Sequence, residues 1–175
     1  MPTAPRPITR RFGDDGQIPN NPDLPVVILQ GALDPALSPD AIHHIQRGNG
    51  WTGNWVWTVF DYHHWHPDAH EALSVASGHA DLMLGGPQGE LFRVEAGDTL
   101  ILPAGTGHCR LSSSGDFAVC GCYPQGQGRY STCRAGEGRD RVAEIARVPL
   151  PDTDPLSGPD GPLIRAWRGS AEDRG

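Results

Sequence analysis

The sequence has no long apolar run, and this absence excludes a membrane-spanning helix. A helix that crosses a bilayer needs roughly 18 or more consecutive apolar residues, and no segment of the 175-residue chain approaches that length. The first residues, Met1 to Arg6, also lack the apolar centre of a secretory signal. We therefore expect a cytoplasmic protein without a membrane partner.

Cysteines are few, and none has the paired spacing of a disulfide framework or a zinc site. The four cysteines contain no C-x-x-C pair; they are Cys109, Cys120, Cys122 and Cys133. Cys120 and Cys122 would share one face of a strand, but no second Cys/His pair is in reach to complete a soft-metal site. Reduced, buried cysteines are therefore expected.

The sequence also has no basic stripe. It carries 14 basic and 21 acidic residues, with a net charge of -7 and a pI near 5.5. An acidic surface repels phosphate backbones, so nucleic acid is not an expected partner. No helix-turn-helix pattern accompanies the rest of the chain, which also disfavours a transcription factor.

Glycine and proline are abundant, at 23 and 17 residues, whereas long helical patterns are scarce. This composition favours an all-β protein of short strands and turns, and the length suits one domain. We expect a lead-in at 1–23, a barrel with a preceding strand and helix at 24–124, an appendage packed on the barrel at 125–167, and a disordered tail at 168–175.

Apolar periodicity predicts the elements in chain order. A buried strand is expected at 24–30, a helix at 38–47 with Ser38 as N-cap and Gly48 as its left-handed stop, and one alternating strand from Trp51 to His66. Further strands are expected at 71–77, 80–84, 90–95, 99–102 and 117–123, a spacing typical of an antiparallel sandwich or barrel. A one-sided helix is expected at 139–147, and Leu163, Ile164 and Trp167 are expected to anchor the appendage.

One segment concentrates the chemically reactive residues. Tyr62 to Glu71 contains four of the eight histidines and a glutamate. Alternation along an extended chain places Tyr62, His64 and His66 on one face, whereas His63 points away. A second segment ends an apolar run in a Pro/Gly turn that delivers His108. Together the two segments predict a metal site on a β-scaffold.

A helical zinc site is a competing interpretation of the first segment. His66 and His70 are four residues apart, and such a pair on a helix can share a zinc ion. Pro67 opposes this interpretation because it would occupy the first helical position and leave His66 outside the helix. The glutamate that H-E-x-x-H requires between its histidines is also missing.

At these residues the sequence resembles the cupin superfamily. The first cupin motif is matched by His64, His66, Glu71 and Gly78. Four residues separate His66 from Glu71, and six separate Glu71 from Gly78. The second motif is matched up to its histidine by Gly97, Pro103, Gly105 and His108. Ser112 stands where that motif ends in asparagine, a position that is not a ligand in the family. Segments across roughly residues 12–167 further resemble the YjlB-like group of small bacterial cupins, a group defined by sequence rather than by an assigned reaction.

The resemblance implies a single-domain jelly-roll barrel (a double-stranded β-helix), usually dimeric, with its site inside the mouth. One divalent transition metal is expected on His64, His66, Glu71 and His108, and such a shell leaves two positions of a six-coordinate ion open. Fe(II) is favoured, and Mn, Ni, Co or Zn suit the same donors. A purely structural metal is the alternative, although such sites are usually closed and rich in cysteine.

Two classes of function follow from this site. The first is a metal-dependent enzyme on a small polar organic metabolite, with a non-haem Fe(II) dioxygenase preferred over a Mn, Ni or Zn isomerase, lyase or decarboxylase. In the lyase version Tyr62 or His70 would move protons as a catalytic group. The second class is a non-catalytic module that binds a small ligand. The expected partners are thus a small molecule and a second copy of the chain.

Overall fold

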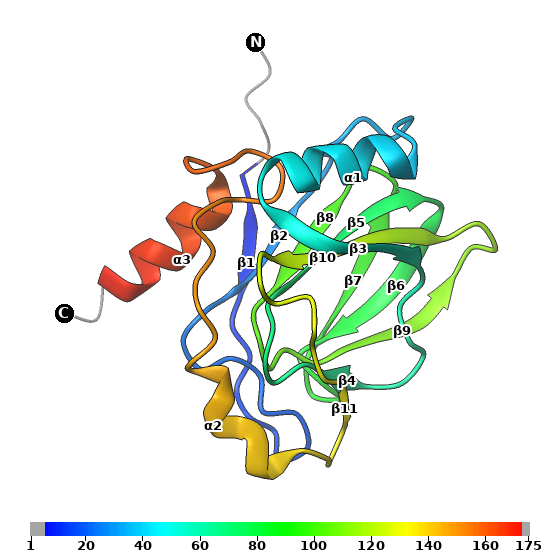
Figure 1. Ribbon diagram of the computed structural model, residues 1–175. Coiled ribbons are helices and arrows are strands. Elements are labelled where there is room, and N and C mark those ends of the chain that lie inside the picture. Colours follow the sequence, from blue (N-terminus) through cyan, green and yellow to red (C-terminus); the bar gives the residue numbers. More distant parts are fainter. Residues whose placement is uncertain (1–5, 173–175) are drawn as a thin grey trace.

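Two antiparallel β-sheets face each other in the computed structural model, which describes residues 6–172 (Figure 1). The six-stranded sheet has the order β1 (Ile8–Arg10), β2 (Val26–Leu29), β8 (Thr99–Leu102), β5 (Glu71–Ser77), β10 (Ala118–Pro124) and β3 (Trp51–Trp57). The five-stranded sheet has the order β11 (Cys133–Arg134), β4 (His64–Trp65), β9 (His108–Ser113), β6 (His79–Leu84) and β7 (Glu90–Glu95). This architecture confirms the predicted all-β, double-stranded β-helix fold.

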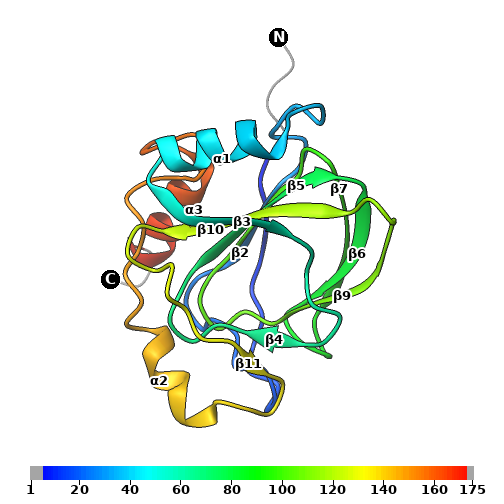
Figure 2. The same ribbon diagram turned by 45° about the vertical axis from the view of Figure 1, so that its right-hand side comes forward.

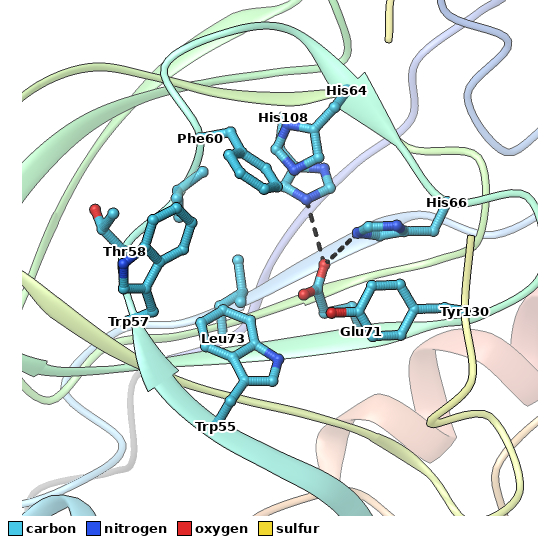
Figure 3. A pocket seen from close by; sticks show the side chains of 11 residues that line it. Trp55, Trp57, Thr58, Phe60, His64, His66, Glu71, Leu73, His108 and Tyr130 are labelled. Carbon is cyan, nitrogen blue, oxygen red and sulfur yellow. Dashed lines mark ion pairs between the residues drawn. The ribbon is translucent and has the colours of Figure 1, made fainter. Parts of the chain in front are cut away.

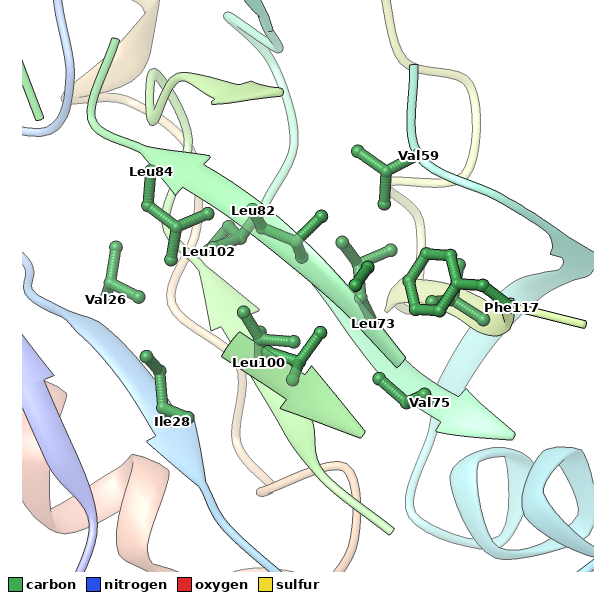
Figure 4. Close-up of a cluster of buried hydrophobic side chains, with 13 residues drawn as sticks. Val26, Ile28, Val59, Leu73, Val75, Leu82, Leu84, Leu100, Leu102 and Phe117 are labelled. Carbon is green, nitrogen blue, oxygen red and sulfur yellow. The ribbon is translucent and has the colours of Figure 1, made fainter. Parts of the chain in front are cut away.

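The main core lies between the two sheets (Figure 4). Strand β5 shows how the sequence builds it: Leu73 and Val75 point inward, whereas Ala72 and Ala76 pack on the opposite face. The inward cluster also draws on both sheets and their connections, with Val26, Ile28, Val59, Ala80, Leu82, Leu84, Val94, Leu100, Leu102, Phe117 and Val119. A strand that is apolar on both faces is expected where a second layer covers the sheet.

Helices supply that second layer on the outer face of the six-stranded sheet (Figures 1 and 2). Helix α1 (Pro39–Gly48) begins as predicted, because the Ser38 hydroxyl accepts a hydrogen bond from the amide of Ala41 at 3.2 Å. The prediction of Gly48 as a left-handed stop is wrong. Gly48 is the last helical residue, and the chain reverses two residues later at Gly50, where φ is +78°.

The C-terminal segment adds the short helices η1 (Arg139–Arg141) and α2 (Val142–Ile145), followed by α3 (Pro162–Glu172). Leu163 and Trp167 on α3 are fully buried against the six-stranded sheet, and Trp167 Nε1 donates to the carbonyl of Pro25 at 2.9 Å. Helix α3 extends into the 168–175 tail for which we expected disorder. Residues 173–175, and residues 1–5 of the expected lead-in, lie outside the described residues.

The prediction of one continuous strand from residue 51 to 66 is wrong. Strand β3 ends at Trp57 in one sheet, and β4 begins at His64 in the other, so residues 58–63 cross between the layers. A β-bulge near Gly53, whose φ is +69°, also interrupts the alternation within β3. As a result Trp51 packs on the outer face whereas Trp55 packs against the inner core.

Within residues 6–172 no helix combines the length and the apolar character that crossing a membrane requires.

Candidate metal centre

Three of the predicted histidines converge at one point between the sheets (Figure 3). His64 on β4 and His108 on β9 are paired across adjacent strands, and His66 directly follows β4. One ring nitrogen of each lies within 4.8 Å of the others, and all three side chains are buried. These three histidines could therefore bind a metal ion together.

Backbone carbonyls fix the tautomer of all three rings. The Nδ1 atoms of His64, His66 and His108 lie 3.0, 2.9 and 3.0 Å from the carbonyl oxygens of Tyr62, Ser131 and Thr106 respectively. A carbonyl oxygen only accepts hydrogen bonds, so Nδ1 carries the proton of the neutral ring and Nε2 presents a lone pair. Metal-binding histidines have this arrangement.

Glu71 reaches the same point from β5 in the opposite sheet. Its Oε2 lies 3.2 Å from Nε2 of His66 and 3.2 Å from Nε2 of His108. Within the described residues Oε2 is buried without a hydrogen-bond donor. Lone pairs and a carboxylate oxygen thus face one another, and a positive charge between them, from a proton or a metal ion, stabilises such a cluster. The nitrogen and oxygen donors fit a divalent transition metal.

The pKa values of these groups reflect the same contacts. Burial, with His108 next to it, lowers the pKa of His64 to about 2. Burial acts to raise the pKa of Glu71, but His66 and His108 outweigh it and hold that pKa well below its ordinary value. Burial acts to lower the pKa of His66, yet the negative charge of Glu71 leaves it raised. The carboxylate therefore stays ionised and attracts positive charge.

Tyr123, a residue that the sequence analysis did not single out, holds Glu71 in place. Its hydroxyl on β10 donates to Oε1 of Glu71 at 3.2 Å and accepts from Nε1 of Trp55 at 2.8 Å. Burial, followed by the negative charge of Glu71, raises the pKa of Tyr123, so the hydroxyl remains a donor. Glu71 is thus held through Oε1, which leaves Oε2 directed at the histidines.

An apolar cavity of about 250 Å³ opens beside the four groups (Figure 3). Four aromatic side chains dominate its wall: Trp55, Trp57, Phe60 and Tyr130. The remaining lining consists of Thr58, Val59 and Leu73. Trp57 is 55% exposed and marks the entrance. The ring of Phe60 meets that of Trp57 edge-to-face with the centroids 5.2 Å apart, which braces this side of the wall.

The segment expected to be an appendage completes the site. Tyr130 lines the cavity and stacks on Tyr123 with ring centroids 4.4 Å apart. The next residue, Ser131, offers its carbonyl to His66, and its amide and hydroxyl donate to the carboxylate of Asp68. Strand β11 then pairs with β4. The start of the 125–167 segment is therefore part of the barrel wall.

The two predicted catalytic groups, Tyr62 and His70, lie behind the cavity wall and not in its described lining. Tyr62 stacks on Phe60 at 4.8 Å, and the guanidinium of Arg134 lies 3.8 Å above its ring. His70 is fully buried: its ring contacts that of Trp167 at 4.8 Å, and its Nδ1 accepts from the amide of Ala104 at 2.9 Å.

Burial lowers the pKa of His70 to about 4, which favours the neutral ring. Neither Tyr62 nor His70 is among the described residues that line the cavity. Both are packing residues in the structure, and no contact with the cavity supports their predicted part in proton transfer.

Known proteins are similar to this chain in sequence. The Cupin domain family matches residues 58–118, a span that contains His64, His66, Glu71 and His108. The uncharacterized protein YjlB of Bacillus subtilis (strain 168) is 40% identical over 158 residues, which cover 89% of this chain and 93% of the relative.

Similar solved structures are more distant. An acireductone dioxygenase from Bacillus anthracis, with a cadmium ion in its active centre, is 15% identical over 58% of this chain and 79% of that chain, at a TM-score of 0.39. An uncharacterized protein with a double-stranded β-helix domain from Klebsiella pneumoniae is 18% identical over 78% of this chain and 85% of that chain, also at 0.39. Since the match to YjlB extends over nearly the whole of both chains and the Cupin domain family matches within it, the chain belongs to the cupin superfamily, among relatives of YjlB.

Proposed function

We propose that this protein is a metal-dependent enzyme that acts on a small organic molecule. The proposal assigns one divalent transition metal to His64, His66, His108 and Glu71. The observation that carries it is the convergence of these donors, with a carboxylate oxygen that lacks any hydrogen-bond donor, at the wall of a cavity. Four protein ligands leave two positions of a six-coordinate ion open toward that cavity.

Within this class we favour a non-haem Fe(II) dioxygenase, because the wall is poorly equipped for proton transfer. Isomerases and lyases need side chains that give or take protons at the substrate. Besides the four proposed ligands, the described lining offers only the hydroxyls of Thr58 and Tyr130. When bound, Fe(II) with two open positions supplies oxygen chemistry next to the substrate.

The aromatic wall has a defined task in such an enzyme. Trp55, Trp57 and Phe60 keep bulk water away from the reacting atoms, which prevents hydrolytic side reactions and strengthens electrostatic interactions inside the cavity. Tyr123 orients Glu71 from behind and leaves Oε2 as the donor atom. The chain's own contribution is thus to position the ion, orient the substrate and keep the cavity dry.

The second candidate is a Mn-, Ni- or Zn-dependent isomerase, lyase or decarboxylase on the same ligands. Tyr130 favours it, since its side chain lines the cavity beside Glu71 and carries a hydroxyl that can exchange a proton (Figure 3). Apart from Thr58, Tyr130 is the only residue in the described lining that carries a hydroxyl. The dioxygenase therefore remains the preferred function.

Nitric oxide, which binds Fe(II) where O2 would, tests the proposal directly. Protein purified without a histidine tag is loaded with Fe(II) under argon, its iron is quantified, and nitric oxide is added. We expect about one iron per chain and the electron paramagnetic resonance signal of a high-spin iron nitrosyl. His108→Ala should lose both, whereas His44→Ala, an exposed histidine on α1, should retain both.

Two outcomes would count against this function, and a third would count against the proposed ligands. Wild-type protein that holds no metal after reconstitution removes the site altogether. Iron that binds fully but gives no nitrosyl signal indicates a closed, structural metal. If the wild type binds iron and gives the nitrosyl signal, but His108→Ala gives the same signal, the ion is held by other ligands.

A further inference from the structure

The cavity wall has no positive charge of its own. No arginine is found among the described residues that line it, and the whole chain contains no lysine. Two arginines lie near the wall but are engaged elsewhere. Arg134 covers the ring of Tyr62 at 3.8 Å, and Arg110 donates to the carbonyl of Val59 at 3.0 Å and to the hydroxyl of Ser113 at 3.3 Å. The only positive charge that a bound anion would meet among the described lining is therefore that of the proposed metal.

The charge of the proposed centre sets how much negative charge a substrate can bring. Three neutral imidazoles and the carboxylate of Glu71 leave a divalent ion with one net positive charge. A singly anionic head that chelates the ion cancels this charge. A second carboxylate would lie against Trp55, Phe60 and Leu73 without a positively charged partner, which is costly.

The shape of the cavity points in the same direction. Its volume of about 250 Å³ is below the range usual for drug-sized ligands, so a single ring or a short branched chain fills it. Phe60 stacks on Tyr62 and Tyr130 stacks on Tyr123, so two of the aromatic walls are held from behind. Fixed aromatic surfaces favour planar apolar groups, which gain edge or offset contacts beyond the area they bury.

We propose that the substrate is a compact molecule with an uncharged, apolar or aromatic body and one singly anionic oxygen head that chelates the metal. Small dicarboxylates are then poor ligands. This inference rests on the proposed function and narrows its substrate class. The expected small polar metabolite would carry its polar group only at the end that binds the metal.

Hydroxamates test the inference because they keep the chelating head constant while the body varies. Protein reconstituted with Co(II) is titrated, and the visible absorption of the cobalt reports binding. Benzohydroxamate should bind at least about tenfold more tightly than acetohydroxamate, since its ring is buried in the wall. 3-Carboxybenzohydroxamate should bind about tenfold more weakly than 3-carbamoylbenzohydroxamate, which matches it in size and lacks the charge.

A variant that supplies the missing cation provides a gain-of-function test. Thr58 lines the cavity near its entrance, next to Trp57. Thr58→Arg should improve the affinity for the carboxylated probe by about tenfold and leave that for the carbamoyl probe nearly unchanged. Thr58→Gln is the control for side-chain length, and it should not discriminate between the two probes.

The outcomes separate this inference from the proposed function. If no hydroxamate changes the cobalt spectrum, or if no cobalt binds, the metal function itself fails. If all four probes change the spectrum with equal affinity, the open metal site stands and the proposed substrate class is overturned. Tighter binding of the carboxylated probe by the wild type would likewise overturn it.

Discussion

The hydroxyl of Tyr123 lies 3.2 Å from Oε1 of Glu71 and donates a hydrogen bond to it. The same hydroxyl accepts a hydrogen bond from Nε1 of Trp55, whose ring is part of the cavity wall. One side chain therefore links the orientation of a proposed metal ligand to the position of the wall that faces the substrate.

Tyr123→Phe tests this link. The substitution leaves Oε1 of Glu71 and Nε1 of Trp55 without a partner in a buried environment, so we expect the free energy of unfolding to fall by about 1–3 kcal/mol. Loss of a group that orients a ligand should weaken metal affinity by about tenfold or more. Urea unfolding and competition with a chromophoric chelator measure the two effects.

Tyr62→Phe is the matched control for Tyr123→Phe. It removes one phenol hydroxyl near the site but keeps the ring contacts with Phe60 and Arg134. We expect neither stability nor metal affinity to change. A turnover defect in this variant, with metal content intact, would restore the proton-transfer role that the sequence suggested for Tyr62.

Glu71→Gln should stabilise the metal-free protein while it weakens metal binding. The introduced amide can still accept from Tyr123, and its two N–H groups can donate to the lone pairs of His66 and His108, which Oε2 of Glu71 now faces at 3.2 Å. We expect a gain of about 1–2 kcal/mol in unfolding free energy without metal. Metal affinity should drop by about a hundredfold.

Urea unfolding in the presence of a chelator measures the first effect of Glu71→Gln, and metal competition measures the second. Glu95→Gln, at an exposed position on β7, is the control for the loss of one negative charge. If Glu71→Gln is instead less stable than the wild type without metal, then His66 or His108 carries a proton to Glu71 in the metal-free state.

For His70 we predict a structural role. His70→Ala removes the acceptor for the buried amide of Ala104 and the ring packed on Trp167, and should lower the free energy of unfolding by about 2–4 kcal/mol. His70→Asn places an amide oxygen close to the former Nδ1 and should recover part of that loss. Thermal and urea unfolding of both variants distinguish the roles: a catalytic histidine would lose turnover equally in both, with stability unchanged.

Helix α3 should contribute substantially to stability through one side chain. Trp167→Ala removes a buried indole and its hydrogen bond to Pro25, so a loss of about 3–5 kcal/mol is expected in urea unfolding. Arg168→Ala, on the exposed side of the same helix, should cost less than about 1 kcal/mol. Similar losses in the two variants would show that α3 is not held by its apolar face.

Much of the barrel was predictable because turn residues mark the ends of the strands in the sequence. The strands expected at 71–77, 90–95 and 99–102 coincide with β5, β7 and β8. Gly78 illustrates why such boundaries are reliable. Its φ is +69°, and an added Cβ would lie 2.4 Å from the hydroxyl of Ser114 and 2.8 Å from the amide of Phe117, so the turn demands glycine.

The parts that escaped prediction depend on contacts between distant segments. The alternating pattern continues across residues 58–63, although β3 and β4 join different sheets, because periodicity reports exposure and not strand partners. Tyr123 reaches Glu71 because β10 pairs with β5, and Tyr130 enters the cavity because the chain returns to β4 through β11. No local pattern around either tyrosine encodes those pairings.

The proposed ligands come from both layers of the sandwich: His64 and His108 from the five-stranded sheet, and Glu71 from the six-stranded sheet. An ion held by all of them joins the layers as a removable cross-link. Separation of the sheets at this end would break its coordination, so the bound ion opposes that opening. Amide hydrogen exchange in β4 and β9 should therefore slow on metal loading.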